Sequence, residues 1–366
     1  MSEPDSDAFA GVKAVEARFA LDEARLSAWM ARHVEGFEGP LTINQFKGGQ
    51  SNPTYQLATP GAVYVLRRKP PGVLLPSAHA VDREFKVISA LHGAGFPVAR
   101  PYALCTDDAV IGSMFYIMGK VDGRILWDGA LPGLTPAQRR EIYMAQVATM
   151  AQLHSLDYAA IGLGDYGRPG NYFARQVDRW TKQYKASETV SIPEMDALIE
   201  WLPRTLPQDD QTSIVHGDFR LDNMILHPDQ PRILAVLDWE LSTLGNPLAD
   251  ITYFLTNWVA PEGAGAGRAA FGHLDAASLG IPSVEEVAAE YCRLTGRAAL
   301  PGLNWFFAYN LFRLAAIFQG IAGRVRDGTA ASSQASDYGD RAADAGRAAW
   351  TFAVKAGAQI QNEVMT

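Results

Sequence analysis

Hydrophobic and polar residues follow strand-like and helix-like periods along this chain, and from about residue 119 the pattern is mainly helical. From Leu41 to Pro70, short β-prone runs alternate with glycine, asparagine and proline, which is typical of antiparallel strands joined by turns. The stretch from Gly112 to Gly123 predicts one more strand. Between these regions the apolar residues recur at helical spacing, at Val81, Phe85, Ile88 and Leu91. The first part of the chain is therefore predicted to form a small sheet with one helix.

Helical signals also precede the predicted sheet. The first forty residues read as helical, and Asp22 is placed to cap a helix. The apolar side of that helix carries Leu26, Trp29 and Met30.

Capping signals mark two helix starts in the later part of the chain. Thr135 and Pro136 combine an N-cap residue with a first-turn proline, and the pattern continues toward Leu153. Ser283 and Glu286 have the spacing of a capping box, ahead of a second helix. The chain from residue 119 onward is therefore predicted to be mainly helical.

A twenty-residue apolar run, Leu303 to Ala322, has nearly the length of a membrane span. Four polar side chains interrupt it, namely Asn304, Asn310, Arg313 and Gln319. Such residues are costly in a bilayer, so the run predicts a buried helix of a protein without membrane association.

Length and charge narrow the class of protein. A chain of 366 residues is too long for one ordinary core, and we expect an N-terminal lobe over residues 1–118 and a helical lobe over 119–366. The formal charge of -8 disfavours nucleic acid as a partner, because phosphate binding needs a basic face. The two cysteines form no metal or disulfide framework, and the acidic, polar start predicts a cytoplasmic location.

The chemistry-bearing residues gather between Ser213 and Asp250. Asp218 lies on a short polar stretch between two apolar runs, and Asp238 ends a further apolar run. Together with Asn223, these residues offer one acid that can accept a proton and two oxygen ligands for a hard cation such as Mg²⁺. An acid, then an asparagine five positions later, then an acid at a strand end is the order found in kinases.

The segments HGDFRLDN and LDWE resemble the signature of the aminoglycoside phosphotransferase family, whose members are similar to choline kinase. The segments GGQSNPTYQL and YVLRRKPPGVLLPSAHAVDREFKVISAL extend this resemblance to the kinase-like domains that are fused to acyl-CoA dehydrogenases in animals. The resemblance covers about residues 40 to 320. It implies an α+β, protein-kinase-like fold of two lobes, with a small β-rich N-terminal lobe and a larger, mainly helical C-terminal lobe.

The resemblance also implies roles for individual residues. Asp218 matches the catalytic base, and Asn223 and Asp238 match the metal-binding asparagine and aspartate. Arg67 matches the strand lysine that contacts phosphate in protein kinases, and Glu84 matches its helix partner. Arginine is a forked donor in place of a point charge, so Arg68 and Lys69 stay open as alternatives to Arg67.

The nucleotide would also contact the segment FKGGQSN, which stands in place of the glycine-rich loop. Ser51 and Asn52 are expected near the phosphates, although the segment lacks the full GxGxxG pattern. A second glycine set, GLGDYG at Gly162, follows a predicted helix and is interpreted as a loop.

Two nearby polar residues are interpreted as structural. His216 precedes a glycine and is expected to fix the loop through a backbone carbonyl, and Asp250 is expected to bond backbone amides beneath it. A zinc hydrolase built on His216, Asp218 and His227 is the weaker alternative, because no HExxH helix accompanies them.

The sequence thus predicts a Mg²⁺-dependent transfer of the γ-phosphate of ATP or GTP to a hydroxyl group of a small molecule. The acceptor stays open between an aminoglycoside-like compound and a hydroxyacyl thioester or related metabolite. The alternative from another class is a nucleotide-binding regulatory module that turns nothing over.

Overall fold

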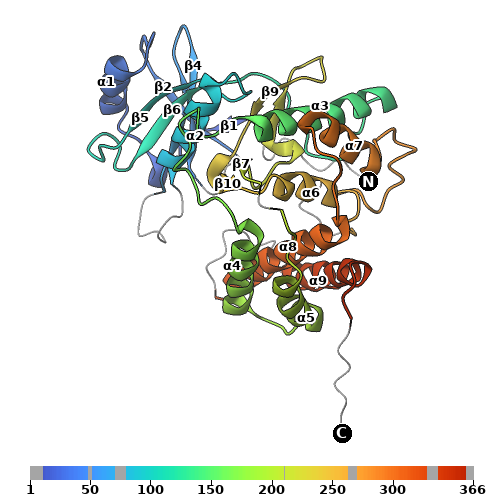
Figure 1. Cartoon of the computed structure of the whole chain (residues 1–366). Helices are drawn as coiled ribbons and strands as arrows, with labels where there is room; N and C mark the ends of the chain where they lie inside the picture. Colours follow the sequence, from blue (N-terminus) through green and yellow to red (C-terminus); the bar gives the residue numbers. More distant parts are fainter. Residues whose placement is uncertain are drawn as a thin grey trace. The chain divides into compact units, whose positions relative to one another are not determined.

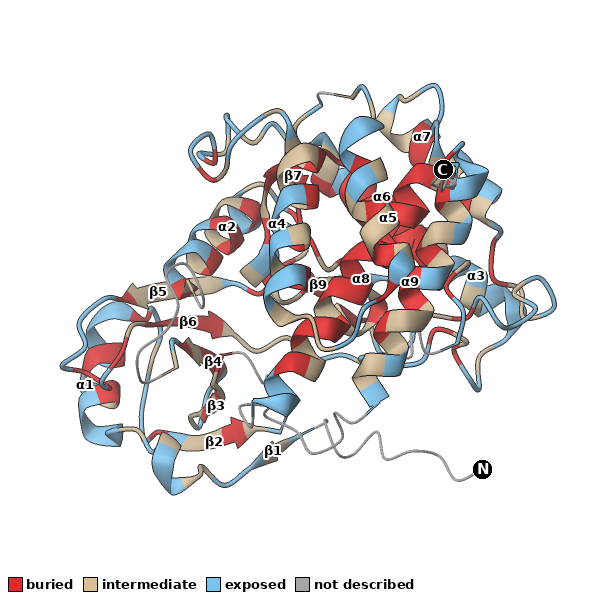
Figure 2. Cartoon of the chain, turned by 90° about the horizontal axis from the view of Figure 1, so that it is seen from below, coloured by how far each residue is buried: buried red, intermediate tan, exposed pale blue. Residues whose placement is uncertain are grey.

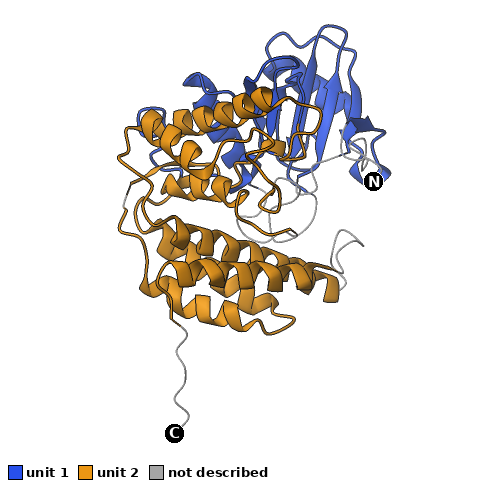
Figure 3. Cartoon of the chain, turned by 90° about the vertical axis from the view of Figure 1, so that its right-hand side faces the viewer, with its two compact units in different colours: residues 1–125, 158–166, 223–242 blue, residues 126–157, 167–222, 243–366 orange. Residues whose placement is uncertain are grey.

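The structure, a computed structural model, describes residues 11–47, 52–70, 80–209, 211–262, 270–327 and 337–359. It divides into two units, coloured in Figure 3. Unit 1 comprises Met1–Ile125, Tyr158–Tyr166 and Asn223–Ser242, and unit 2 comprises Leu126–Asp157, Gly167–Asp222 and Thr243–Thr366. The predicted lobe boundary at residues 118 and 119 stays a prediction.

Unit 1 is built on a six-stranded antiparallel sheet in the order β1-β2-β3-β4-β6-β5 (Figure 1). Its strands are β1 (Val12–Lys13), β2 (Thr42–Phe46), β3 (Thr54–Ala58), β4 (Val63–Arg68), β5 (Pro101–Cys105) and β6 (Phe115–Gly119). The strands predicted between Leu41 and Pro70 and after Gly112 are all present. Strands β1 and β5 were not predicted. Strand β1 lies in the segment that was expected to be helical and is held by its pairing with β2, and the residues of β5 do not alternate between apolar and polar.

The alternation of side chains along the strands gives the sheet two different faces. One face buries Tyr55, Leu57 and Leu66 against α1 (Glu23–His33), which Asp22 caps as predicted. The helix α2 (Val81–Gly93) contacts β5 and β6. Its buried residues are Val81, Glu84, Val87, Ile88 and Leu91, whereas Phe85 is half-buried. The apolar face expected for this helix therefore contains a glutamate.

The remaining part of unit 1 includes a short hairpin, β8 (Met224–Leu226) paired with β9 (Ile233–Val236). After β9 the chain makes a 3₁₀ turn at Trp239–Leu241. The Trp239 indole is buried, donates to the Val236 carbonyl at 2.9 Å and packs edge-on against Phe96. This packing fixes the end of β9, where Asp238 lies.

Unit 2 is mainly helical, with one two-stranded sheet of β7 (Ser213–Val215) and β10 (Thr243–Gly245). Its helices are α3 (Pro136–Ser155), α4 (Tyr172–Ser187), α5 (Pro193–Trp201), α6 (Leu248–Thr256), α7 (Val284–Thr295), α8 (Leu303–Arg326) and α9 (Tyr338–Lys355). The predicted cap at Thr135 of α3 and the predicted capping box at Ser283 of α7 are both confirmed. The GLGDYG segment lies in turns between α3 and α4, as predicted.

Helix α8 is the buried centre of unit 2 and packs against α4, α6 and α9. Figure 2 shows it coloured as buried over most of its length. Its polar residues have specific neighbours: the Asn310 amide donates to Thr252 at 3.1 Å, and the Gln319 amide donates to Thr189 at 2.9 Å. None of the helices among the described residues is long and apolar enough to cross a membrane.

Candidate active site

Arg67 lies at the centre of a charged cluster in unit 1. Strand register places it opposite Tyr116, so both side chains leave the same face of the sheet, toward α2. Its Nε lies 2.8 Å from Glu84 Oε2, and its Nη2 lies 2.9 Å from Asp238 Oδ1. The guanidinium therefore bridges a helix carboxylate and a strand-end carboxylate and uses a different nitrogen for each. A lysine side chain has a single nitrogen and could not do this.

Glu84 is almost completely buried, with 1% of its side chain exposed, and accepts bonds from three directions. Besides Arg67, the Asn52 amide donates to its Oε1 at 2.9 Å and the Tyr116 hydroxyl donates to its Oε2 at 3.0 Å. Burial raises the pKa of Glu84, and the charge of Arg67 opposes that rise. Burial by itself would lower the pKa of Arg67, but Glu84 is the largest influence that raises it above its usual value. Arg67 and Glu84 therefore form an ion pair that is largely removed from water.

Asp238 follows β9 in a left-handed conformation, with φ 64° and ψ 63°, which is uncommon for a residue other than glycine. The amide of Leu237 donates to the Asn223 carbonyl at 2.8 Å, so Asn223 lies beside the residue that precedes Asp238. Glu240 Oε2 is 3.8 Å from Arg67 Nη2. Strained backbone at a carboxylate is a feature of functional sites.

The donor set around Asp238 suits a hard cation. Asp238 and Glu240 offer carboxylate oxygens and Asn223 an amide oxygen, and Mg²⁺ prefers a few protein oxygens completed by water and phosphate. Among the described residues, no group of three or more His, Cys, Asp or Glu side chains is placed to hold a metal. Carboxylate and amide oxygens of this kind fit a cation whose remaining ligands are water and a bound phosphate.

The loop that carries Asp218 follows β7 in unit 2, and Asp250 on α6 holds it through hydrogen bonds. The Asp250 carboxylate accepts from the backbone amides of His216 at 2.7 Å and Gly217 at 2.9 Å. Gly217 has φ +86°, which glycine adopts without strain. The prediction that Asp250 bonds backbone amides under this loop is confirmed.

The two histidines near the loop have structural partners. His154 on α3 lies 3.3 Å from Asp250 through Nε2 and 2.7 Å from the Tyr291 hydroxyl through Nδ1. His216 Nδ1 accepts from the Asp218 amide at 3.2 Å. The bond to the Asp218 amide shows that His216 fixes the loop, and the bond expected to a backbone carbonyl stays a prediction.

Asp218 is half-buried, and its carboxylate has a hydrogen-bond donor that sequence reasoning missed. The Tyr253 hydroxyl donates to Asp218 Oδ1 at 3.0 Å. Tyr253 comes three residues after Asp250, so both project from the same face of α6, and that spacing is the signal that could have identified it. Arg220, two residues after Asp218, pairs with Asp222 through an Nε–Oδ1 bond of 2.6 Å.

The predicted site residues therefore fall into two groups. Those of unit 1 are gathered by the contacts given above, and they are Asn52, Arg67, Glu84, Asn223 and Asp238. Asp218 belongs to unit 2. Ser51 lies outside the described residues, and the Asn52 amide is engaged with Glu84.

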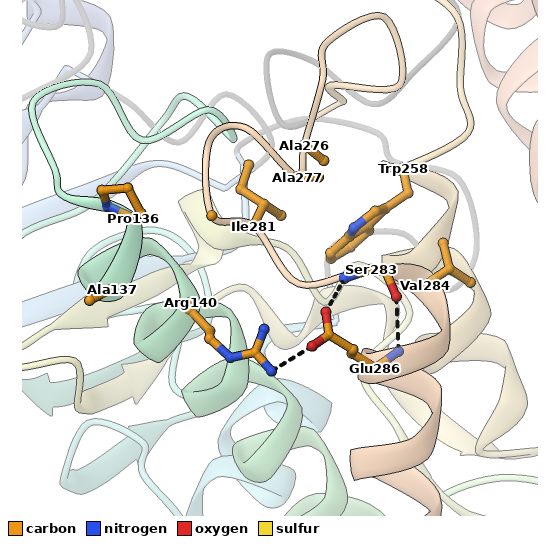
Figure 4. Close-up of a pocket in the computed structure, with 11 residues that line it drawn as sticks. Pro136, Ala137, Arg140, Trp258, Ala276, Ala277, Ile281, Ser283, Val284 and Glu286 are labelled. Atoms are coloured by element: carbon orange, nitrogen blue, oxygen red, sulfur yellow. Dashed lines mark hydrogen bonds and ion pairs between the residues drawn. The ribbon is translucent and has the colours of Figure 1, made fainter.

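A pocket of about 600 Å³ lies elsewhere in unit 2, between the starts of α3 and α7 (Figure 4). Its wall includes Trp258 and Ile281, and the Arg140–Glu286 ion pair of 2.7 Å lies at its edge. None of the predicted site residues lines it.

Comparison with known proteins places this geometry in a family. The model of the phosphotransferase enzyme family, APH, matches residues 42–291. Acyl-CoA dehydrogenase family member 10 of Mus musculus is 45% identical over 326 residues, which cover 89% of this chain and 30% of that protein. Acyl-CoA dehydrogenase family member 11 of Homo sapiens is 46% identical over 310 residues, which cover 83% of this chain and 39% of that protein. The chain thus spans less than half the length of these curated relatives.

Solved structures support the same fold. A Ralstonia eutropha protein provisionally named an aminoglycoside phosphotransferase is 52% identical, with a TM-score of 0.83 over 92% of this chain and 99% of that one. Choline kinase of Cryptosporidium parvum is 11% identical, with a TM-score of 0.60 over 91% of this chain and 96% of that one, and shows the fold alone. The predicted α+β, kinase-like fold is confirmed. The chain belongs to the phosphotransferase enzyme family.

Proposed function

We propose that the chain is a Mg²⁺-dependent phosphotransferase that moves the γ-phosphate of ATP or GTP to a hydroxyl group of a small molecule. One observation carries the proposal. Arg67 bridges Glu84 at 2.8 Å and Asp238 at 2.9 Å, which places a cation, its helix partner and a strand-end carboxylate together. These are the parts that kinases use to hold and neutralise nucleotide phosphates.

In unit 1, Arg67 would hold phosphate oxygens, and Glu84 keeps the guanidinium oriented for this. Asn223 and Asp238 would hold the magnesium ion. The cation, when bound, neutralises charge that develops on the phosphate oxygens. Asp238 is the partner of Arg67 that can be shared, because 36% of its side chain is exposed, compared with 1% for Glu84.

In unit 2, Asp218 would orient the acceptor hydroxyl and receive its proton. Phosphoryl transfer has a largely dissociative transition state in most analyses, so positioning contributes more than proton abstraction itself. The anchoring of the loop by Asp250 supports this role, because it fixes the backbone on which Asp218 stands.

The charges around Asp218 balance, so they do not by themselves select the acceptor. The carboxylates of Asp218 and Asp222 are matched by the guanidinium groups of Arg220 and Arg313, which leaves no excess positive charge to reject an aminoglycoside. The relatives that are named acyl-CoA dehydrogenases belong to thioester chemistry. We therefore place a hydroxyacyl thioester or a related anionic metabolite ahead of an aminoglycoside as the acceptor.

The test has two steps. Calorimetric titration of ATP and of GTP, with and without Mg²⁺, should show affinity that depends on the cation. Hydroxyacyl thioesters, other hydroxylated metabolites and aminoglycosides are then screened for nucleotide-dependent phosphate transfer. Nucleotide affinity without transfer to any acceptor would support the regulatory-module alternative. No nucleotide affinity in the presence of Mg²⁺ would overturn both.

A further inference from the structure

Arg313 on α8 is a buried arginine that the predicted roles do not use. Only 8% of the residue is exposed, and within the described part of the chain it forms no ion pair with a carboxylate. Its Nη2 donates to the Gly217 carbonyl at 2.6 Å, while its Nε has no hydrogen-bond partner. A buried cation that forms no ion pair is costly, so its position calls for a specific reason.

The surroundings of Arg313 connect it to the Asp218 carboxylate. The guanidinium carbon lies 4.8 Å from the ring centroid of Tyr253 and 5.5 Å from that of Trp180. Aromatic faces attract a cation, and the attraction is strongest where water is excluded. The hydroxyl of the same Tyr253 donates to Asp218 Oδ1 at 3.0 Å.

Helices α6 and α8 therefore both bond the peptide groups of Gly217, in the loop that carries Asp218. Asp250 of α6 accepts from the Gly217 amide, and Arg313 of α8 donates to the Gly217 carbonyl. The bond from Asp250 fixes the peptide group between His216 and Gly217. The bond from Arg313 fixes the peptide group between Gly217 and Asp218. Tyr253 then fixes one oxygen of the carboxylate.

We propose that Arg313 and Tyr253 are positioning residues that set the place and the rotation of the Asp218 carboxylate for the acceptor hydroxyl. The inference rests on the proposed function, because it assigns the geometry of that same base. A base must approach the proton it accepts to hydrogen-bond distance, and a misplacement of about 1 Å costs about 10²-fold in rate. Tyr253 controls the rotation of the carboxylate, and Arg313 controls the backbone and the placement of the Tyr253 ring.

The first test is Tyr253→Phe against the matched control Tyr143→Phe. Tyr143 is also buried, and its hydroxyl donates to the Gly129 carbonyl at 2.6 Å, with no hydrogen bond to the Asp218 loop among the described residues. With the acceptor found by the screen, Tyr253→Phe should lower kcat about 10- to 100-fold and leave the Kd for nucleotide unchanged. Tyr143→Phe should keep the wild-type kcat. Equal kcat in the two variants overturns the inference.

The second test replaces Arg313. Arg313→Met removes the charge and the donor, and Arg313→Lys keeps the charge with a single ammonium. Gln319→Leu is the control, since Gln319 is a buried polar residue of α8 that contacts Thr189. We expect kcat to fall most for Arg313→Met and to recover in part for Arg313→Lys, while Gln319→Leu loses stability without loss of kcat. Should Arg313→Met fail to fold, Arg313→Lys and Tyr253→Phe carry the test, and wild-type kcat in both overturns it.

A double-mutant cycle separates failure of this inference from failure of the proposed function. Tyr253→Phe, Asp218→Ala and the double variant are compared in urea unfolding, which needs no substrate. Their effects on the unfolding equilibrium constant should be non-additive by about tenfold, as expected for a hydrogen bond to a charged group. Additive effects overturn the inference even if the wild type transfers phosphate. If the effects are non-additive but the wild-type protein transfers no phosphate, the proposed function is overturned and the contact between Tyr253 and Asp218 is only structural.

Discussion

The two buried arginines, Arg67 in unit 1 and Arg313 in unit 2, solve the problem of a desolvated cation in different ways. Arg67 has two carboxylates within 3 Å, Glu84 and Asp238. Arg313 has a backbone carbonyl and two aromatic faces, and no ion pair within the part of the chain that the structure describes. The loss of hydration of the guanidinium is therefore offset by carboxylates in unit 1, and by a carbonyl dipole and aromatic rings in unit 2.

The difference matches what each arginine can do. An ion pair with a partly exposed carboxylate, such as Asp238, can be exchanged for a bound phosphate or cation without a change of fold. A bond to the Gly217 carbonyl cannot be exchanged without moving the loop itself. We infer that the charges of unit 1 are arranged to meet a ligand, and that the groups around Gly217 are arranged to hold the loop that carries Asp218 in one shape.

The largest expected effect is on nucleotide binding and phosphate transfer, and it should differ between Asp238 and Asp218. Asp238→Asn removes a charged cation ligand, so it should weaken Mg²⁺-dependent nucleotide binding and abolish transfer together. Asp218→Asn keeps the shape of the loop, so nucleotide should still bind while kcat falls by about 10²–10⁴-fold. Nucleotide affinity and kcat are measured on both variants. Equal loss of nucleotide affinity in both would mean that Asp218 is itself a metal ligand.

The second effect concerns the stability of unit 1. Glu84→Ala removes one partner of a buried ion pair and leaves Arg67, Asn52 and Tyr116 with unmet bonds, so the free energy of unfolding should fall by about 3–5 kcal/mol. Urea unfolding provides the measurement. Asp178→Ala, which breaks an exposed pair with Lys182, is the control and should cost at most about 1 kcal/mol. Similar losses in the two variants would remove the distinction between a buried and a surface pair.

The third effect tests which cation of β4 meets the phosphate. Arg67→Ala should weaken nucleotide binding by about 1.5–3 kcal/mol, the range for a hydrogen bond to a charged group. Lys69, two residues later, is exposed and serves as the control. Arg68 is buried and interacts with the Tyr55 hydroxyl on the other face of the sheet, so Arg68→Ala should lower stability more than affinity. If Lys69→Ala weakened nucleotide binding and Arg67→Ala did not, the assignment of Arg67 would be wrong.

Local signals in the sequence predicted much of the fold. Caps at Asp22, Thr135 and Ser283 act through bonds within one helical turn, so they are readable from four or five residues. Strands β2, β3, β4 and β6 were likewise predicted from alternation and turn residues. Strand β5, which begins at Pro101, carries no such alternation, and its place is set by pairing with β6.

The candidate site was predictable only where a family motif marks it. Arg67, Glu84 and Asp238 were located by resemblance, and the structure brings them into contact. Glu84 on its own would have been expected on the exposed side of α2, because its burial depends on Arg67 from a strand 17 residues away. Arg313 was visible only as an interruption of an apolar helix, since its partners Gly217 and Tyr253 lie 96 and 60 residues away in the chain.

The smallest expected effect is a change in how stability varies with pH, and it belongs to the anchoring of the loop. Burial by itself would raise the pKa of Asp250, but the hydrogen bonds and electrostatic contacts with His154 and His216 hold that pKa below its ordinary value. The unfolded chain then binds the proton more readily than the folded one. The carboxylate therefore contributes stability above about pH 4, the ordinary value, and this contribution is lost as the pH falls through the lowered pKa.

Asp250→Asn tests this sign. The variant should be less stable than wild type at neutral pH, because an amide cannot accept from both loop amides as a carboxylate does. Below about pH 4 the wild type loses its advantage, so the two unfolding free energies should converge. Gln319→Leu, which changes no titratable group, should differ from wild type by the same amount at every pH. A gap between Asp250→Asn and wild type that widened on acidification would contradict the anchoring of the loop by an ionised Asp250.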